Sequence, residues 1–366
     1  MRADVLRDST VRTILRYLCG LILCGLTCLS LAAEVDQFSG QPFTPLNDSS
    51  AIIEAEVERR IDAAIKLANS PYPRQRPQKV HMMRRRPNCD VERLYDSLRW
   101  YLARPVIGQV ETFAEQSDQV ERRRIPFEQS IYRDFAWQYS PSLVLSQRIA
   151  AVIRLGGTEV GTDKLGHFFT EGASYFAATQ RLQGELNAGL LFGEWSESLY
   201  FGAQTTGVFS YADLVANFQG LRFWNRILAE QPDPLYGTQP EAYIRCENKR
   251  WQRANDFLWA DYVDDGWNES INCSVLRTPA LLQQLSLEDV RCSPKRLPKQ
   301  RYGELAERLL NPQGLAVLAQ HLQPEALLPQ RIHLRSWALP PEAFEHIKDM
   351  RERLELWRQQ QVGEGQ

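Results

Sequence analysis

The sequence carries almost no excess of either charge and, after residue 33, no apolar run long enough to cross a bilayer. Its 366 residues include 43 Lys and Arg against 45 Asp and Glu, a formal net charge of −2. A general nucleic-acid binder needs a clear excess of basic residues, so we expect no nucleic-acid partner. The share of apolar residues, 43%, is that of a globular protein. We therefore expect the mature chain to be soluble or peripheral to a membrane.

Several catalytic motifs are also missing. The chain contains no HExxH, no GxSxG, no Walker loop and no GxGxxG at a strand-to-helix turn. No internal repeat is visible. Alternation of β-branched residues, typical of strands, is scarce between residues 90 and 230, where apolar residues recur at helical spacing instead. This pattern predicts a mainly α fold without hairpins in that region.

The first 33 residues resemble a secretion signal. Four arginines precede the apolar run Tyr17–Ala33, and Ala32 and Ala33 supply small residues for cleavage. We expect residues 1–33 to be removed as a signal peptide and the protein to be periplasmic. An uncleaved membrane anchor is the alternative, because the run is about as long as the shortest spanning helix. Membrane association of the mature protein stays open.

Cysteine usage agrees with export. Three of the seven cysteines lie within the signal, which leaves an even number in the mature chain: Cys89, Cys246, Cys273 and Cys292. An even count in an exported protein predicts two disulfides, with three alternative pairings. The spacings are not those of a zinc ribbon or a redox CxxC pair. We expect the disulfides to pin a loop-rich region that includes the last three cysteines.

Composition divides the chain into five segments. We expect a signal peptide (1–33), then a polar tether with a helix and a basic linker (34–89), a helical core domain with the polar site (90–230), an irregular Cys-containing region (231–300) and C-terminal helices (301–366). The fold class is thus a compact helical domain with an irregular, disulfide-pinned C-terminal region. The basic linker is interpreted as solvated, with contact to anionic lipid head groups as the alternative.

Polar residues at helical spacing mark a candidate site in GTDKLGHFFTEG. Asp163, His167 and Glu171 are each four residues apart, so on a helix they share one face. Asp163 in the first turn also suits the positive end of the helix dipole. A lone histidine in such a row is more often a hydrogen-bonded core or surface group than a ligand. The row alone does not decide between these interpretations.

Two further helices carry similar rows. Glu194 and Glu197 lie three apart in GEWSESLYFGAQ, and FSYADLVANFQG offers Ser210 as an N-cap with Asp213 at the third position. Asn217 follows one turn later. Carboxylates are seldom buried without partners, so three such rows among aromatics predict either a register-fixing network or an acid–base or metal site. The candidate catalytic residues, and the alternative metal ligands, are Asp163, His167, Glu197 and Asp213; the candidate ligand-binding residues are Lys164, Glu194 and Asn217.

One later segment, Trp259–Ser274, places Asp261, Asp264, Asp265 and Glu269 between aromatics. An EF-hand would need a central glycine and a terminal glutamate at set spacing, which the segment lacks. We predict a surface loop pinned by a disulfide, although the segment could add a residue to the site.

The order of these motifs resembles that of the VanZ-like membrane proteins and the YfiM-like bacterial envelope lipoproteins. The resemblance covers about residues 160–225: DKLGHFF, a glutamate on the next helix, then SYADLVANFQG. It implies an envelope location and a shared polar site made of Asp163, Lys164, His167, Glu197, Asp213, Asn217 and Gly220. VanZ-like proteins cross the membrane several times, whereas this core is too polar to do so. The resemblance implies no particular reaction.

These observations predict an exported cell-envelope protein whose polar site is structural or ligand-binding. An envelope lipid or glycan is the expected partner, on the ground of location. The alternative is a metal-dependent hydrolase acting on an envelope lipid or glycan, in which His167 and neighbouring carboxylates hold a divalent metal and a remaining carboxylate activates water.

Overall fold

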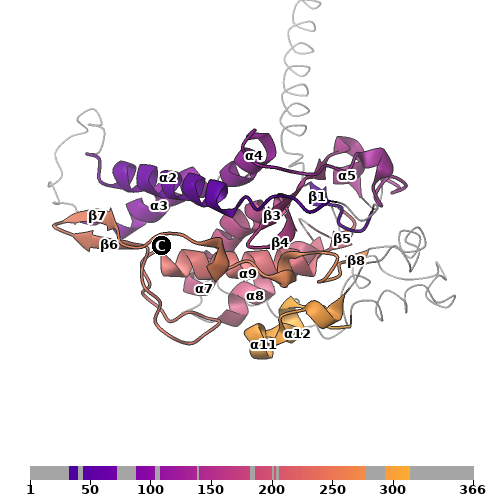
Figure 1. The fold of residues 1–366 in the computed structure, drawn as a ribbon. Coiled ribbons are helices and arrows are strands. Elements are labelled where there is room, and N and C mark those ends of the chain that lie inside the picture. Colours follow the sequence, from indigo (N-terminus) through magenta and orange to yellow (C-terminus); the bar gives the residue numbers. More distant parts are fainter. Residues whose placement is uncertain are drawn as a thin grey trace, which may run out of the picture.

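Helices account for most of the regular structure, and the strands are short (Figure 1). The computed structural model describes residues 33–39, 44–71, 88–103, 108–137, 140–181, 186–199, 202, 206–276 and 293–313. The predicted mainly α fold is therefore confirmed for this part of the chain. Residues 1–32, nearly all of the predicted signal peptide, lie outside the described residues, as do most of the predicted basic linker, Cys292 and most of the predicted C-terminal helical segment.

The helices have the following bounds: α2 (Ser50–Ala68), α3 (Val91–Leu102), α4 (Gln109–Gln116), α5 (Pro141–Ser146), α6 (Asp163–Gly166), α7 (Gly172–Arg181), α8 (Leu186–Leu199), α9 (Tyr211–Arg226), α11 (Lys299–Tyr302) and α12 (Ala306–Leu309). The π-helical turn η2 (His167–Glu171) joins α6 to α7 without a break. Short 3-10 turns are η1 (Phe127–Gln129), η3 (Trp259–Asp261), η4 (Asp265–Trp267), η5 (Pro294–Arg296) and η6 (Gly303–Leu305).

The strands form two-stranded sheets: β1 (Glu34–Val35) pairs in parallel with β2 (Ile149–Ala150), and the antiparallel pairs are β3 (Val152–Leu155) with β4 (Thr158–Gly161), β5 (Val208–Phe209) with β8 (Val275–Leu276), and β6 (Ile244–Glu247) with β7 (Arg250–Arg253). The predicted absence of hairpins in residues 90–230 is wrong at β3–β4. Gly156 and Gly157 both take positive φ, 57° and 84°, in the turn of that hairpin. A Gly-Gly pair between apolar segments is a hairpin signal that helical periodicity obscured.

Helices α7 and α9 cross at the centre of the molecule, where each presents a glycine to the other. A Cβ added to Gly172 would lie 2.5 Å from the Cα of Gly220, and one added to Gly220 would lie 2.0 Å from the carbonyl oxygen of Phe168. No side chain fits at either position without moving a backbone. The two glycines therefore set the close approach of the helices that carry the polar site.

Aromatic side chains fill the core beside this crossing. Phe168 and Phe169 come from η2, and Phe168 contacts rings from α9 and from residues 257–267 at centroid distances of 5.2 to 6.3 Å. Trp224, Trp259 and Trp267 are each 0% exposed. The predicted surface loop over residues 259–274 is thus wrong, because its aromatic residues supply part of the core. Burial of such large rings is a main source of stability in this region.

The prediction of a polar tether is wrong for residues 34–36, which are buried. Glu34, Val35 and Asp36 are 3%, 0% and 1% exposed, and β1 adds to β2. The Asp36 carboxylate accepts hydrogen bonds from the N–H groups of Phe38, Ser39 and Ile131. These backbone donors compensate the burial of a charged group in a segment that looks polar in sequence.

Helix α2 likewise belongs to the main core rather than to a separate N-terminal segment. Its buried face, Ile53, Val57 and Ile61, joins the same apolar cluster as α3, α9 and the β3–β4 hairpin. The helix begins at Ser50, with Ser49 as its N-cap residue. Figure 1 shows α2 lying along α3 on one side of the central helices.

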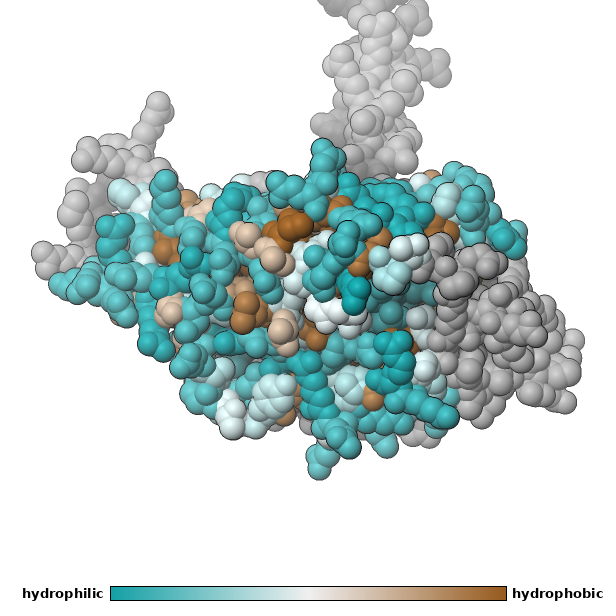
Figure 2. Space-filling view, in the orientation of Figure 1, coloured by the Kyte–Doolittle hydropathy of each residue, from teal (hydrophilic) through white to brown (hydrophobic). Residues whose placement is uncertain are grey.

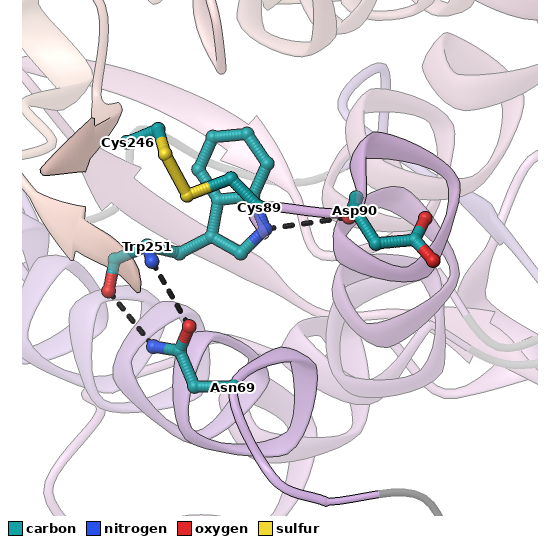
Figure 3. The surroundings of a disulfide bond; sticks show 5 residues. All are labelled: Asn69, Cys89, Asp90, Cys246 and Trp251. Atoms are coloured by element: carbon teal, nitrogen blue, oxygen red, sulfur yellow. Dashed lines mark hydrogen bonds between the residues drawn. A yellow bond between two sulfur atoms is a disulfide. The ribbon is translucent and has the colours of Figure 1, made fainter. Parts of the chain in front are cut away.

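A disulfide between Cys89 and Cys246 ties the start of α3 to the β6–β7 hairpin (Figure 3). Next to it, the amide side chain of Asn69 bonds both the N–H and the C=O of Trp251, at 2.9 and 2.8 Å. The prediction of disulfide bonding is confirmed for this pair. Cys246 is linked back to the helical region, not to the other C-terminal cysteines. The second predicted disulfide stays a prediction, because Cys292 lies outside the described residues.

The face shown in Figure 2 is mainly hydrophilic, with apolar residues in small groups among polar ones. Among the described residues, no helix combines the length and the apolar character that a membrane span requires.

Candidate functional site

A lysine ammonium group lies at the centre of the polar site. Lys164 Nζ is 2.7 Å from Asp163 Oδ2, 2.5 Å from Asp213 Oδ1 and 2.6 Å from Glu269 Oε1. The lysine side chain is 0% exposed, and so is that of Glu269. Three segments that are distant in sequence, namely α6, α9 and the loop after η4, thus meet at one buried cation.

Charge pairing determines the protonation of this centre. Burial alone would lower the pKa of Lys164, but the surrounding carboxylates, Asp163 foremost, raise it well above its ordinary value. Burial would likewise raise the pKa of Asp213, but the charges of His167 and Lys164 lower it. Lys164 is therefore an ammonium and Asp213 a carboxylate at neutral pH. An ammonium held in this way is no general base.

His167 stands beside Asp213 and completes a second part of the network. Its Nε2 lies 3.1 Å from Asp213 Oδ2 and its Nδ1 3.1 Å from Asn217 Oδ1, while Asn217 Nδ2 donates to the Tyr175 hydroxyl at 3.0 Å. Both ring nitrogens face acceptor oxygens, so the ring is doubly protonated. Burial would lower the pKa of His167, but Asp213 raises it well above the ordinary value.

Glu197 enters the network through the start of α9. Ser210 is the N-cap, and its hydroxyl accepts the N–H of Asp213 at 3.1 Å, as the sequence predicted. In a capping box Asp213 would in turn accept the Ser210 N–H. Here Glu197 accepts it instead, at 3.1 Å, which leaves the Asp213 carboxylate for Lys164 and His167. Burial, reinforced by the charge of Asp213, raises the pKa of Glu197 well above its ordinary value.

The π-helical turn η2 places Glu171 at the edge of the site. Glu171 Oε2 lies 3.9 Å from His167 Nδ1, and the two side chains are 19% and 13% exposed. Single π turns within α-helices are frequent at functional sites, because the extra residue re-aims the side chains around it. The row of Asp163, His167 and Glu171 predicted from their spacing is thus retained despite the wider turn.

Two carboxylates that the sequence did not assign to the site are part of it. Glu269 bonds Lys164 and accepts the Ser210 hydroxyl at 2.9 Å. Glu34, from β1, lies close enough to Asp163 and Glu269 for one oxygen of each to fall within 4.8 Å of the others. Burial raises the pKa of Glu269 to about 7 and that of Glu34 well above its ordinary value, and Asp213 adds to the shift of Glu34. In the sequence, Glu34 is hard to recognise as a site residue because it directly follows the predicted signal peptide.

Glu194, predicted to bind ligand, joins two helices. Its Oε1 pairs with Arg308 Nε and Nη2 at 2.8 and 2.7 Å, which ties α8 to α12. Another acid, Glu111 of α4, lies against α6: a Cβ on Gly166 would fall 2.5 Å from its Oε2. Burial, followed by repulsion from Asp163, raises the pKa of Glu111 to about 8.

Two groups in the described residues have the spacing of a metal site: Asp163 with His167 and Asp213, and Glu34 with Asp163 and Glu269. In the first group the facing atoms of His167 and Asp213 are already paired with each other, and Lys164 holds another oxygen of Asp213. The predicted convergence of Asp163, His167, Glu197 and Asp213 is present. Its electrostatics are those of a closed, charge-paired network.

No protein-family model matches the chain, and no match was found among the curated proteins or the solved structures.

Proposed function

We propose that this chain is an exported protein of the bacterial cell envelope, in which the buried network supports a binding site for a polar ligand at His167 and Glu171. The proposal is supported by the part of the network that is exposed to solvent. The side chains of His167 and Glu171 are 13% and 19% exposed, whereas those of Lys164 and Asp213 are 0% and 1% exposed. A ligand can approach this network at its histidine end.

The chemistry at that end favours a ligand rich in hydroxyl groups. Both ring protons of His167 are directed at Asp213 and Asn217, so the ring itself has little left to donate. Glu171 offers carboxylate oxygens, which accept hydrogen bonds and prefer donors. An envelope glycan presents many such donors. The Lys164 cluster behind the ring would hold His167 in one orientation, so the exposed edge is preorganised.

The NMR resonances of the His167 ring test this proposal. Glycan fragments from the cell wall should shift these resonances in the purified mature protein. Glu171→Gln should make the shift smaller, whereas Ser174→Ala, on the exposed side of α7, should leave it unchanged. Vesicles of envelope phospholipids serve as the second probe. A response to vesicles alone would assign a lipid ligand. No response to either probe, together with a loss of stability in His167→Gln, would leave the network a structural one.

The cellular location of the protein is a separate part of the proposal. We propose that the mature chain begins at Glu34 and lies in the periplasm. Fractionation and N-terminal sequencing should find Glu34 as the first residue. A chain recovered in the membrane fraction with residues 1–33 attached would establish the anchor instead. The irregular C-terminal region would be pinned by the remaining cysteines, Cys273 and Cys292.

A metal-dependent hydrolase is the second candidate, supported by the clustering of ligand atoms from Asp163, His167 and Asp213 within 4.8 Å. For this function His167 would have to lose a proton and Asp213 its contact with the ring. Zinc or manganese bound to the purified protein and lost in His167→Ala would support the hydrolase. A metal that survives this substitution would argue against it.

A further inference from the structure

Three buried carboxylates meet at one point from three separate parts of the chain. Glu34 belongs to β1, Asp163 to α6, and Glu269 to the loop after η4, and they are 3%, 5% and 0% exposed. One oxygen atom of each lies within 4.8 Å of the other two. Carboxylates at such distances repel one another strongly in a medium that excludes water.

Each of the three has an oxygen atom without a hydrogen-bond donor. These atoms are Glu34 Oε2, Asp163 Oδ1 and Glu269 Oε2. Lys164 contacts the other oxygen of Asp163 and of Glu269. A buried carboxylate oxygen that has lost water and gained no donor is costly, so three such oxygens in one cluster of carboxylates call for a partner.

The cationic side chains nearby supply no partner for Glu34. Five carboxyl groups lie in the network, Glu34, Asp163, Glu197, Asp213 and Glu269, against the two cations Lys164 and His167. Lys164 contacts Asp163, Asp213 and Glu269, whereas His167 contacts Asp213 and does not reach Glu34 or Glu269 in any contact of the described residues. Glu34 is therefore without an ion pair among the described residues, although it lies beside Asp163 and Glu269.

The surrounding residues hold these oxygens in place. A Cβ at Gly161 would lie 2.0 Å from Asp163 Oδ1 and 2.6 Å from Val35 Cβ, so only glycine leaves that oxygen its position between α6 and β1. Gln37 accepts the N–H of Glu269 at 2.8 Å and donates to the carbonyl of Glu159 at 3.0 Å. Ligands of metal sites are commonly fixed by an outer layer of this kind.

We propose that Glu34, Asp163 and Glu269 bind a divalent cation that fastens the β1 strand to the helical core. With carboxylate oxygens alone and neither imidazole nor thiolate, the ligand set suits Ca²⁺, Mn²⁺ or Mg²⁺ rather than Zn²⁺ or Cu²⁺. The site is separate from the exposed edge at His167, and it does not depend on ligand binding there. Glu34 follows the expected cleavage point, so the site is complete in the mature chain.

Metal analysis combined with thermal unfolding tests this site. The purified mature protein should contain about one equivalent of Ca²⁺, Mn²⁺ or Mg²⁺. Returning that ion after chelation should raise Tm by about 3 °C or more. Glu34→Gln and Glu269→Gln should abolish both effects. Glu56→Gln, which alters a buried carboxylate paired with Arg59 and Arg60, and His167→Ala should both retain the ion.

Terbium provides a measurement that needs no variant, because Tb³⁺ occupies oxygen-ligand sites and is sensitised by nearby aromatic rings. Tyr132, whose hydroxyl donates to the carbonyl of Val35 next to Glu34, is such a ring. Sensitised emission that Ca²⁺ displaces is expected. Absence of a bound cation, of emission and of any rise in Tm would overturn the proposal and mean that protons neutralise the three carboxylates. A cation lost in His167→Ala but retained in Glu34→Gln would overturn it too, in favour of the hydrolase site.

Discussion

Glu197 accepts the backbone N–H of Ser210 at 3.1 Å, across a sequence separation of 13 residues. This contact takes the place of the local bond that Asp213 would make in a capping box, and it is why Asp213 is available to two cations. The N-cap of α9 and the polar site therefore share residues, so a substitution at the cap should also alter the polar site.

The first prediction follows from this sharing. Ser210→Ala removes the hydroxyl that accepts the Asp213 N–H and donates to Glu269, so it should lower the free energy of unfolding by about 1–3 kcal/mol. Ser49→Ala is the control, since Ser49 occupies the N-cap of α2 without a side-chain cap bond and should change stability much less. Denaturant unfolding measures both. Equal losses in the two variants would contradict the role given to Ser210.

The second prediction concerns the buried ammonium. Lys164→Met should destabilise the protein by about 4 kcal/mol or more, because it leaves Asp163, Asp213 and Glu269 close together without their shared cation. Lys66→Met, on the exposed side of α2, should be nearly neutral. Unfolding titrations compare the two variants. A stable Lys164→Met protein would mean that the carboxylates take up protons with little cost.

Sequence patterns predicted the part of the site that is built from local repeats. Asp163 and His167 are four residues apart on one helical segment, and Asp213 and Asn217 are four apart on another. Helical spacing therefore places each pair on one face of its own helix before any tertiary contact is known. Glu269 reaches Lys164 across 105 residues, and no periodicity connects them. Its segment was therefore predicted to lie at the surface.

Glu34 shows a different limit. It lies in a short polar stretch after the expected cleavage point, where composition predicts a tether, yet pairing of β1 with β2 buries it. The hairpin at Gly156 and Gly157 was missed because its flanking apolar residues also fit a helix. In each case the contact that determines the structure joins residues far apart in sequence or lies in a strand of two to four residues. Such a strand is too short to show a periodic pattern.

The third prediction tests the crossing of α7 and α9. Gly172→Ala places a methyl group 2.5 Å from the Cα of Gly220, a backbone atom that cannot turn aside, so the helices must separate. We expect the free energy of unfolding to fall by about 1–3 kcal/mol. The NMR resonance of the His167 ring should also shift, because α7 and α9 carry the neighbours of this ring. Ser174→Ala, two residues along, should change neither. A stable Gly172→Ala protein with an unshifted resonance would contradict the tight crossing.

The fourth prediction is a pH dependence at Glu111. Its pKa is about 8 in the folded protein against an ordinary value of 4.5, because burial disfavours the charged form. The folded state therefore binds this proton more tightly than the unfolded chain does. Its contribution to stability is complete below 4.5 and is lost as pH rises from about 4.5 to about 8.

Glu111→Gln keeps the shape of the side chain and removes this titration. The variant should gain stability relative to the parent as pH rises through that range, with little difference near the acid end, while its Oε1 can still accept the N–H of Gly108. Urea unfolding at several pH values measures the gain. Glu128→Gln, an exposed control, should show no such trend. A difference between Glu111→Gln and the parent that stays constant with pH would show that Glu111 is ionised in the folded protein, and that α4 tolerates a carboxylate against α6.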